Sequence, residues 1–583
     1  MRPEELGQYY ESILDKEVRK EGGIYYTPLY IVDYIVAHTV GKLLEGKTPK
    51  EATKIKIVDP ACGGGVFLLG AYQYLLDWHE KHLGKLTLAN RQKILVDNIF
   101  GVDIDPLAVE ITKYCLSMKC TKGKDCFLDL TENICIGNSL IGTDFYEGKD
   151  MKQFTDADMR KINAFDWYKA FPQVFAPNRN QQGVGFDIVM SNPPYTYLIP
   201  AIIQEYFQET YQFQNYQKDL YLIFLEKYSK LLKHGGMFGV IVSNTWLLSL
   251  TYQKIRQYLT SQYTWRKILY LPNPVFKAVV DTHILVFDYE KPAGKYQFDV
   301  DIYRGEDYPL LHKLSSSDIP KDGSPINIMA NRNLRRIAEK IIKRCKQLKD
   351  FCNVFSGVVP FEQGAGTPPQ TAKIMQTKPY VAEGKRPSKE WLPLLRGSLI
   401  HRYTNKWNRN YWILYGRNLA APRDPAIFKA AEKIVVRQTG DSLIATLIGK
   451  NIVCRKNLHI ILNNSTLDLR FILTLVNSKL MNYVYEYLNP ERGEALAEVK
   501  KGHVEALPIP SIDLSDKPTK KAHDRLVELA NQMLSANEQV RESVVHRRIH
   551  EQRISILERE INKIVYWLYG LSDPEITIID RED

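Results

Sequence analysis

The amino-acid sequence predicts an α/β protein, with a mostly parallel sheet covered by helices and a second, basic part after it. Three observations predict this. Short β-branched runs alternate with helical patterns between residues 54 and 289. The 583 residues are several times the ~100–200 of one domain. The net charge of +11 arises entirely after residue 300, so the two halves of the chain differ in composition.

The predicted strands follow one another along the first half of the chain. They are KIKIVDP (54–60), NIFGVDID (98–105), FDIVMSNPPY (186–195), GGMFGVIVSN (235–244), RKILYLPN (266–273) and THILVFDY (282–289). Helical patterns separate the first of them, and a strand–helix–strand unit places its strands parallel in one sheet. We expect the sheet to end at a linker near residues 290–300. We also expect residues 197–217 to form a loop over the sheet edge.

The composition excludes several classes of protein. Hydrophobic residues make up 44% and charged residues 25%, which argues against a disordered, collagen-like or disulfide-scaffold chain. No apolar run approaches ~18 residues and the N-terminus is acidic and polar, so we expect a cytoplasmic protein. The eight cysteines have no regular spacing and are expected to be reduced. Four of them (Cys115, Cys120, Cys126 and Cys135) lack the CxxC spacing of zinc sites, and no metal site is predicted.

A glycine-rich loop and an acidic strand end predict a nucleoside pocket. The loop DPACGGGVF (59–67) follows one strand and precedes a helical pattern, and its glycines would let a ligand approach the backbone. The next strand ends in GVDIDP (101–106), where Asp103 can accept hydrogen bonds from both hydroxyls of a ribose. Either element alone fits a tight turn or a helix cap equally well.

The tetrapeptide Asn192-Pro193-Pro194-Tyr195 lies at the carboxyl end of a predicted strand, where open α/β sheets bind their ligands. The prolines stiffen this segment, and Pro193 has no amide hydrogen. Its carbonyls and the Asn192 side chain can therefore act together as hydrogen-bond acceptors. Tyr195 adds a flat surface for stacking.

The second half has the charge pattern of a polyanion-binding surface. Residues 331–470 contain 26 basic and 9 acidic side chains. Between residues 396 and 412, basic and aromatic side chains interleave, as nucleic-acid surfaces require. The candidate DNA contacts are Arg396, Arg402, Lys406, Arg409 and Arg437. For Arg437, a salt-bridged position in a strand is an equally good interpretation.

These motifs, in this order, resemble those of the γ-type N6-adenine DNA methyltransferases, of which the TaqI enzyme is typical, with a C-terminal target-recognition domain as in restriction-modification enzymes. The resemblance implies a Rossmann-like methyltransferase domain that uses S-adenosylmethionine, a mixed α/β target-recognition domain and C-terminal helices. The implied division is an N-terminal helical segment with a cofactor motif (1–50), the catalytic domain (51–300), the recognition domain (301–510) and a helical segment (511–583), which we expect to brace the recognition domain.

The resemblance also implies roles for individual residues. S-adenosylmethionine would contact Tyr26, Thr27, Pro28, Asp59, Ala61, Gly63, Asp103, Ile104, Asn138 and Phe224. Asn138 stands where the family usually has aspartate, so it keeps an acceptor oxygen but lacks the charge. The catalytic residues would be Asn192, Pro193, Pro194 and Tyr195, with Phe276 stacking on the extruded base opposite Tyr195.

The implied function is sequence-specific N6-adenine methylation of double-stranded DNA by a monomer whose partner is a cognate restriction endonuclease. Three alternatives stay open: the methylating part of a fused nuclease-methyltransferase, a non-catalytic DNA-binding specificity subunit, and an RNA or protein methyltransferase. Nuclease-like Glu-x-Lys tripeptides occur at Glu383 and Glu498. They lack an upstream acidic partner, so no nuclease activity is expected in this chain.

Overall fold

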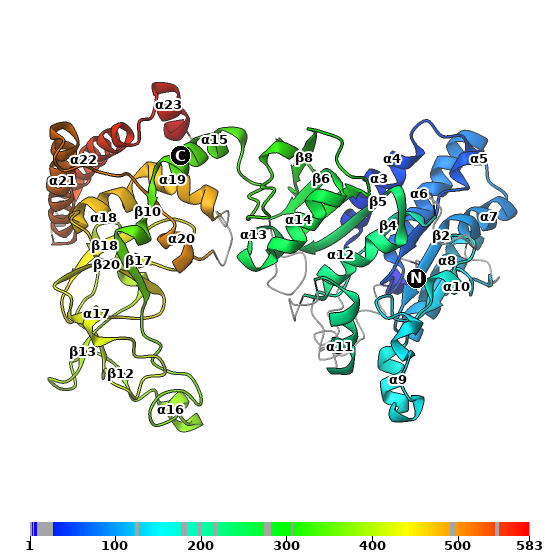
Figure 1. The fold of residues 1–583 in the computed structure, drawn as a ribbon, viewed down its shortest axis with the longest axis horizontal. Coiled ribbons are helices and arrows are strands. Elements are labelled where there is room, and N and C mark those ends of the chain that lie inside the picture. Colours follow the sequence, from blue (N-terminus) through cyan, green and yellow to red (C-terminus); the bar gives the residue numbers. More distant parts are fainter. Residues whose placement is uncertain are drawn as a thin grey trace. The chain divides into compact units, whose positions relative to one another are not determined.

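The chain folds into two compact units, Met1–Ile328 and Met329–Asp583 (Figure 1). The structure is a computed structural model that describes residues 3, 5–7, 27–122, 127–175, 184–195, 201–213, 219–272, 282–305, 307–489, 497–542 and 547–581. Among them, no helix combines the length and apolar character that a membrane span requires. The seven cysteines in this part of the chain form no disulfide.

The first unit is built on a sheet that has nine strands among the described residues, in the order β3-β2-β1-β4-β5-β7-β6-β8-β9 (Figure 1). Their bounds are β1 Ile57–Asp59, β2 Ile99–Asp103, β3 Ile134–Ile136, β4 Phe186–Ser191, β5 Leu232–Ser243, β6 Thr264–Leu271, β7 Thr282–Asp288, β8 Gln297–Ile302 and β9 Leu310–Ser315. The six predicted strands are confirmed. Neighbours from β3 to β5 are parallel, whereas β7 is antiparallel to both β5 and β6.

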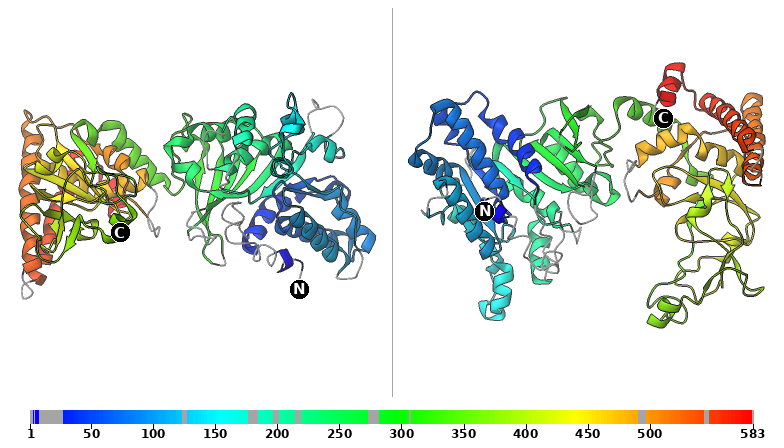
Figure 2. Two further views of the ribbon diagram at one scale, coloured as in Figure 1. Left: turned by 90° about the horizontal axis from the view of Figure 1, so that it is seen from below. Right: turned by 180° about the vertical axis from the view of Figure 1, so that it is seen from behind.

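Helices cover both faces of this sheet (Figure 2). In β5, Gly239 faces α3, because a Cβ there would lie 2.7 Å from side-chain carbons of Ile35 and Thr39. The preceding residue, Phe238, packs against Tyr228 of α12. Adjacent strand residues point to opposite faces, so α3 and α12 lie on opposite sides. The helices are α3 Leu29–His38, α4 Val40–Leu44, α5 Pro49–Ala52, α6 Val66–Leu83, α7 Leu88–Asn98, α8 Pro106–Thr121, α9 Asp156–Ile162, α10 Trp167–Ala170, α11 Ala201–Thr210, α12 Leu220–Leu231, α13 Thr245–Leu248 and α14 Gln253–Gln262.

Two local expectations differ from the structure. The sheet continues through the linker expected near residues 290–300, because β8 pairs with β6 and β9 pairs with β8. The charges of β8 resemble a linker in the sequence, but Asp299 and Asp301 both lie 3.0 Å from Lys267 Nζ. The expected loop at residues 197–217 contains α11, whose buried face includes Ile203 and Phe207.

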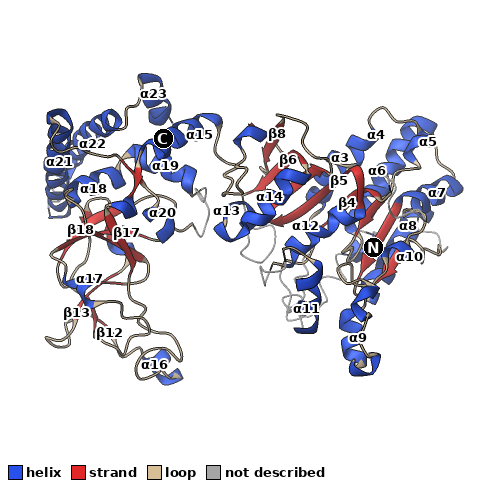
Figure 3. Cartoon of the chain, in the orientation of Figure 1, coloured by secondary structure: helices blue, strands red, loops and turns tan. Residues whose placement is uncertain are grey.

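The second unit contains two four-stranded sheets among its described residues (Figure 3). One has the order β11-β20-β17-β18 and the other β12-β16-β13-β19, with the short pairs β14-β15 and β10-β21 beside them. The bounds are β10 Lys346–Gln347, β11 Cys352–Ser356, β12 Val381–Glu383, β13 Leu392–Leu395, β14 Ile400–His401, β15 Thr404–Asn405, β16 Tyr411–Ile413, β17 Glu432–Arg437, β18 Ala445–Gly449, β19 Val453–Cys454, β20 Leu458–Asn463 and β21 Pro508–Ile509.

The C-terminal helices share a core with the first of these sheets. Leu529 of α21 and Ile561 of α22 belong to the same buried cluster as Ile434 and Ile461 of the sheet. The segment after residue 510 therefore packs as part of the second unit. The helices of this unit are α15 Arg332–Arg344, α16 Ala372–Thr377, α17 Pro425–Lys429, α18 Leu469–Asn477, α19 Lys479–Leu488, α20 Lys501–Glu505, α21 Lys517–Glu542, α22 Arg547–Leu568 and α23 Asp573–Arg581.

Candidate active site

Four predicted site residues come together at one edge of the first sheet. Asp59 and Asp103 are the last residues of β1 and β2, and Asn138 and Asn192 follow β3 and β4. These four strands are parallel neighbours, so their carboxyl ends share an edge. The topology thus places the glycine-rich loop, the acidic strand end and the proline-rich tetrapeptide side by side.

The loop after β1 is shaped by glycine and by a buried carboxylate. Asp59 is 1% exposed and accepts a hydrogen bond from the Ala61 N–H at 3.0 Å. Burial raises the pKa of Asp59 to about 7, although the Ala61 N–H and the Ser191 hydroxyl favour its charged form. Gly65 has φ 81° directly before α6, and a Cβ there would lie 2.8 Å from the Thr112 side chain. Glycine is therefore required at this position.

The raised pKa of Asp59 predicts a pH-dependent stability. In the unfolded chain this carboxyl ionises near its ordinary value of 3.8, whereas in the folded protein it ionises at about 7. Between these values the unfolded state releases a proton that the folded state keeps, so the stability falls as the pH rises. As the pH rises from about 4 to about 8, we expect the free energy of unfolding of Asp59→Asn to increase relative to that of the wild type, on the order of 2–4 kcal/mol in total.

Urea unfolding of both proteins at several pH values measures this difference. The Asn side chain can still accept from the Ala61 N–H, which makes the pair well matched. A stability difference that stays constant with pH would contradict the buried carboxyl assigned to Asp59.

Asp103 joins the glycine-rich loop to the start of α8. Its two carboxylate oxygens accept hydrogen bonds from the Gly63 N–H at 2.8 Å and the Asp105 N–H at 2.9 Å. Burial raises the pKa of Asp103. Asp105 in turn caps α8 by accepting from the Leu107 N–H. The predicted ribose-binding carboxylate is therefore held by backbone donors from both sides.

Two further predicted cofactor residues lie beside it. Ile104 is 41% exposed. Asn138 is half-buried; its side-chain oxygen accepts from the Leu140 N–H at 3.0 Å and its backbone N–H donates to the Asn163 carbonyl at 2.7 Å. Asn138 is thus fixed at the edge, with its oxygen already engaged in a local turn.

The Asn192 side chain is oriented by the segment that precedes α3. Asn192 Nδ2 donates to Thr27 Oγ1 at 3.1 Å, and Thr27 is buried. Pro28 is the N-terminal cap residue of α3. Because the amide nitrogen faces Thr27, the amide oxygen is directed away from it. The structure therefore brings together two motifs that are 165 residues apart in the sequence.

Tyr195 is held by residues that lie outside the predicted motifs. Its carbonyl accepts from the Leu220 N–H at 3.0 Å, and its ring packs edge-on against Tyr221 at 5.9 Å. The Tyr221 hydroxyl pairs with Thr245 at 3.0 Å. Just before α12, Asp219 accepts a hydrogen bond from Tyr252. The only sequence signal for these contacts is the position of the polar residues beside α12 and β5.

The structure describes some of the remaining predicted residues of this site and not others. Phe224 is 5% exposed on α12, with its ring 6.3 Å from Tyr228. Pro193 is buried and Pro194 half-buried. Tyr26 and Phe276 lie outside the described residues. Within the described residues, no group of three or more His, Cys, Asp or Glu side chains is arranged to hold a metal.

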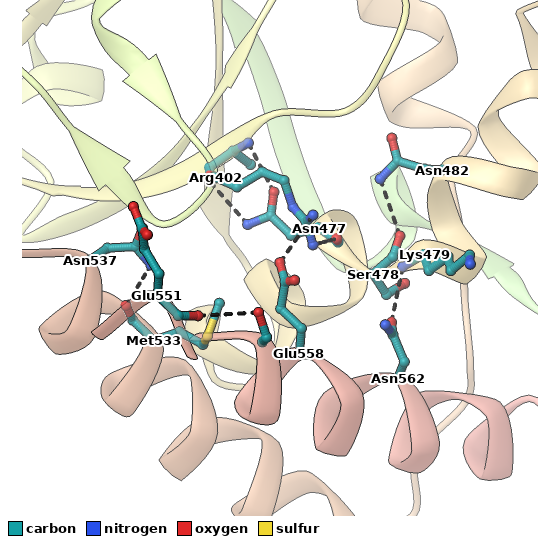
Figure 4. Close-up of polar contacts among 12 residues, drawn as sticks. Arg402, Asn477, Ser478, Lys479, Asn482, Met533, Asn537, Glu551, Glu558 and Asn562 are labelled. Atoms are coloured by element: carbon teal, nitrogen blue, oxygen red, sulfur yellow. Dashed lines mark hydrogen bonds and ion pairs between the residues drawn. The ribbon is translucent and has the colours of Figure 1, made fainter. Parts of the chain in front are cut away.

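The basic candidates of the second unit separate into two groups. Arg396 lies 4.0 Å over the Tyr411 ring and 3.5 Å from Glu383, and Arg402 contacts Glu558 at 3.1 Å (Figure 4). Lys406 and Arg409 are exposed. Arg437 is half-buried at the end of β17 and donates to Thr439 Oγ1 at 3.2 Å. Arg396 and Arg402 form the first group, which contacts protein carboxylates. Lys406, Arg409 and Arg437 form the second group, which makes no ion pair with the described residues.

Comparison with known proteins adds two family matches. Residues 97–276 match the Eco57I restriction-modification methylase family, and residues 392–509 match the TaqI-like C-terminal specificity domain. One relative is the type II restriction enzyme and methyltransferase RM.Eco57I of Escherichia coli, 29% identical over 51% of this chain and 31% of that protein. Another is the adenine-specific methyltransferase BrxX of Escherichia coli O9:H4, 22% identical over 97% of this chain and 58% of that protein.

The chain therefore spans 31% of the length of the first relative and 58% of the length of the second. A solved structure with the same fold is the type IIL restriction-modification enzyme MmeI in complex with DNA, with a TM-score of 0.63 and 14% identity. It matches 99% of this chain and 80% of that one. These findings confirm the predicted methyltransferase fold and the resemblance that the motifs imply: residues 97–276 are similar to the Eco57I restriction-modification methylases, and residues 392–509 are similar to the TaqI-like C-terminal specificity domain.

Proposed function

We propose that this protein is a sequence-specific DNA methyltransferase of a restriction-modification system, which transfers a methyl group from S-adenosylmethionine to N6 of adenine in duplex DNA. The observation that carries the proposal is the tetrapeptide Asn192–Tyr195 beside Asp59 and Asp103 at one sheet edge. We assign methyl transfer to the first unit and target recognition to the second. The four-part division at residues 50, 300 and 510 remains a prediction.

The residues at this edge fit S-adenosylmethionine. Burial raises the pKa values of the Asp59 and Asp103 carboxyls. A cationic ligand beside them would stabilise their charged forms. Asp103 would accept the ribose hydroxyls, as acidic residues do at this place in related folds. The glycine-rich loop lets the ligand approach the backbone closely. When bound, the cofactor supplies an electrophilic methyl group on a sulfonium.

The protein's own residues would then prepare the adenine. Its N6 lone pair is delocalised into the purine ring, which makes it a poor nucleophile. The Asn192 side-chain oxygen and the Pro193 carbonyl would accept the two N6 hydrogens and free the lone pair for in-line attack. Positioning and oriented dipoles are the main contributions available to such a site. As N6 bonds to the methyl carbon, the carbon–sulfur bond would break with its electron pair going to sulfur, and the surplus N6 proton would pass to solvent water.

Access to N6 in a duplex requires the base to leave its stack, at a cost of a few kcal/mol. We propose that Tyr195 and Phe276 offset this cost by stacking on the base. Phosphate and base contacts would come from the exposed basic side chains of the second unit. A monomer that modifies both strands of a palindromic site, protecting it from a separate endonuclease, is the simplest form of this proposal.

A second candidate is the methylating part of a larger nuclease-methyltransferase. The names and lengths of the relatives favour it, because RM.Eco57I is called both a restriction enzyme and a methyltransferase and this chain matches 31% of it. Incubating the protein with unmethylated duplex and Mg²⁺ tests whether nuclease activity accompanies methylation within this chain. Site-specific cleavage would show that the nuclease activity belongs to this chain.

The main proposal predicts the product of the reaction. DNA from cells that express the protein, sequenced at single-base resolution, should carry N6-methyladenine at one short sequence. DNA from cells that carry Asn192→Ala should lack it. Methylation of cytosine, or of RNA or protein instead of DNA, would contradict the proposal, and an asymmetric site would exclude methylation of both strands by one palindrome-reading monomer.

A further inference from the structure

The hairpin β14-β15 in the middle of the predicted recognition surface has a tightly fixed tip. The tip residues are Arg402 and Tyr403. Tyr403 has φ 57°, a left-handed conformation that is unfavourable for a residue other than glycine. Its side chain is buried, and its N–H donates to the Ala445 carbonyl of β18 at 3.0 Å. Surrounding contacts therefore hold the tip in this conformation.

The Arg402 guanidinium supplies two of these contacts (Figure 4). Its Nη2 donates to the Asn477 carbonyl at the end of α18, at 2.6 Å. Its Nη1 lies 3.1 Å from Glu558 Oε1 on α22. One side chain thus connects the hairpin to a helix beside the sheet and to a C-terminal helix. A guanidinium is suited to this because its donors point in fixed directions.

The elements that Arg402 contacts are themselves rigidly placed. The Asn477 side chain is fully buried, accepting from the Ala445 N–H and donating to the Ala445 carbonyl, both at 3.0 Å. On the other strand of the hairpin, Arg541 of α21 donates to the Asn405 carbonyl at 3.1 Å. The hairpin is therefore connected to α18 and α22 by its tip residue Arg402 and to α21 by Asn405 of β15.

The same hairpin lies beside a cationic cluster, defined as Lys406, directly after β15, and Arg437, at the end of β17. Strand β17 lies against β14 of the hairpin. His401 of β14 is not counted in the cluster, because burial, and after it the charges of Lys406 and Arg437, lowers the pKa of this imidazole. Lys406 and Arg437 make no ion pair with any described residue, unlike Arg402. An uncompensated cluster of this kind attracts phosphates.

We propose that Arg402 is a positioning residue: held by Glu558 and the Asn477 carbonyl, it fixes the hairpin so that the cationic cluster meets DNA in one register. This rests on the proposed function. It assigns Arg402 a different role from the direct DNA contact that its place in the sequence predicts. It also gives the C-terminal helices a part in recognition, because Glu558 lies 156 residues beyond Arg402.

The two roles of Arg402 predict opposite effects of removing Glu558. If Arg402 contacts a phosphate directly, deleting the neighbouring carboxylate removes a repulsive charge and strengthens DNA binding. If Arg402 positions the hairpin, the same deletion loosens it and weakens binding to the cognate site. Glu558 is suitable for this test because it is partly exposed and lines a cavity of about 750 Å³, so its replacement buries no unpaired charge.

The experiment measures the affinity of Glu558→Ala for a duplex with the mapped methylation site and for one without it, at several salt concentrations. We expect about three- to tenfold weaker binding to the cognate duplex and unchanged binding to the other. The slope of log affinity against log salt should stay unchanged. Glu551→Ala is the matched control, because Glu551 has the same charge on the same helix but pairs with Arg547.

Two further variants complete the set. Arg402→Ala should behave like Glu558→Ala, whereas Lys406→Ala should weaken binding to both duplexes and reduce the salt slope by about 0.9. Unchanged or tighter cognate binding by Glu558→Ala, or a reduced salt slope for Arg402→Ala, would overturn the positioning role. If wild-type protein binds neither duplex, the proposed function itself fails, and the two failures are thereby distinguished.

Discussion

Replacing Asn192 by alanine is expected to lower the rate of methyl transfer by about 10²–10³-fold while leaving the affinity for S-adenosylmethionine within about twofold. The variant loses an acceptor that acts on N6 as the new bond forms, so the turnover number falls and binding does not. The structure fixes this acceptor through the hydrogen bond from Asn192 Nδ2 to Thr27 Oγ1. Single-turnover transfer of a labelled methyl group, together with calorimetric titration of the cofactor, separates the two quantities.

Two variants serve as controls for this result. Asn192→Asp keeps an acceptor that can receive a hydrogen bond from the Thr27 hydroxyl, and we expect it to retain measurable activity. Thr27→Val leaves Asn192 in place but removes its partner, and a loss of about tenfold is expected from the less restrained amide. Full activity of Asn192→Ala would remove the acceptor role and, with it, the mechanism proposed here.

Asp103→Ala is expected to raise the dissociation constant of S-adenosylmethionine by about 10²-fold. Hydrogen bonds to a charged acceptor contribute about 1.5–3 kcal/mol each, and the ribose hydroxyls would lose such bonds. The Gly63 and Asp105 N–H groups also lose their acceptor, so the glycine-rich loop becomes less ordered. At saturating cofactor, the turnover number should stay within about tenfold of wild type.

Asp105→Asn is a suitable control for this prediction, because it changes a neighbouring charge while keeping an oxygen that can cap α8 through the Leu107 N–H. Its cofactor affinity should match that of wild type. An unchanged dissociation constant for Asp103→Ala, measured on protein with a normal unfolding midpoint, would mean that the ribose is bound elsewhere.

The sequence predicts the central sheet well because its strands are apolar, short and separated by clear helices. It fails at β8, where Asp299 and Asp301 look like linker residues until Lys267 of the neighbouring strand is known to pair with them. The antiparallel placement of β7 has a different cause, the short connection that precedes it. Only ten residues separate it from β6, too few for the helical crossover that a parallel neighbour needs.

The candidate site was predictable to the extent that its residues lie in local motifs. The convergence of Asp59, Asp103 and Asn192 follows from parallel topology, which the strand–helix rhythm already implies. The contacts of Arg402 could not be predicted, because its partners Asn477 and Glu558 are remote in sequence and belong to no motif. A basic residue in a basic segment therefore looks like a DNA contact until the fold shows which carboxylate lies beside it.

The close approach of α3 to β5 at Gly239 also has a consequence for the candidate active site. α3 begins at Leu29, two residues after the threonine that orients Asn192. Any larger side chain at Gly239 would push against Ile35 and Thr39 and displace the helix that begins two residues after that threonine. Random mutagenesis of this protein should therefore yield inactive variants with substitutions in the interior of the sheet. The positions of these substitutions would identify residues that hold the active site in place as well as residues that take part in the reaction.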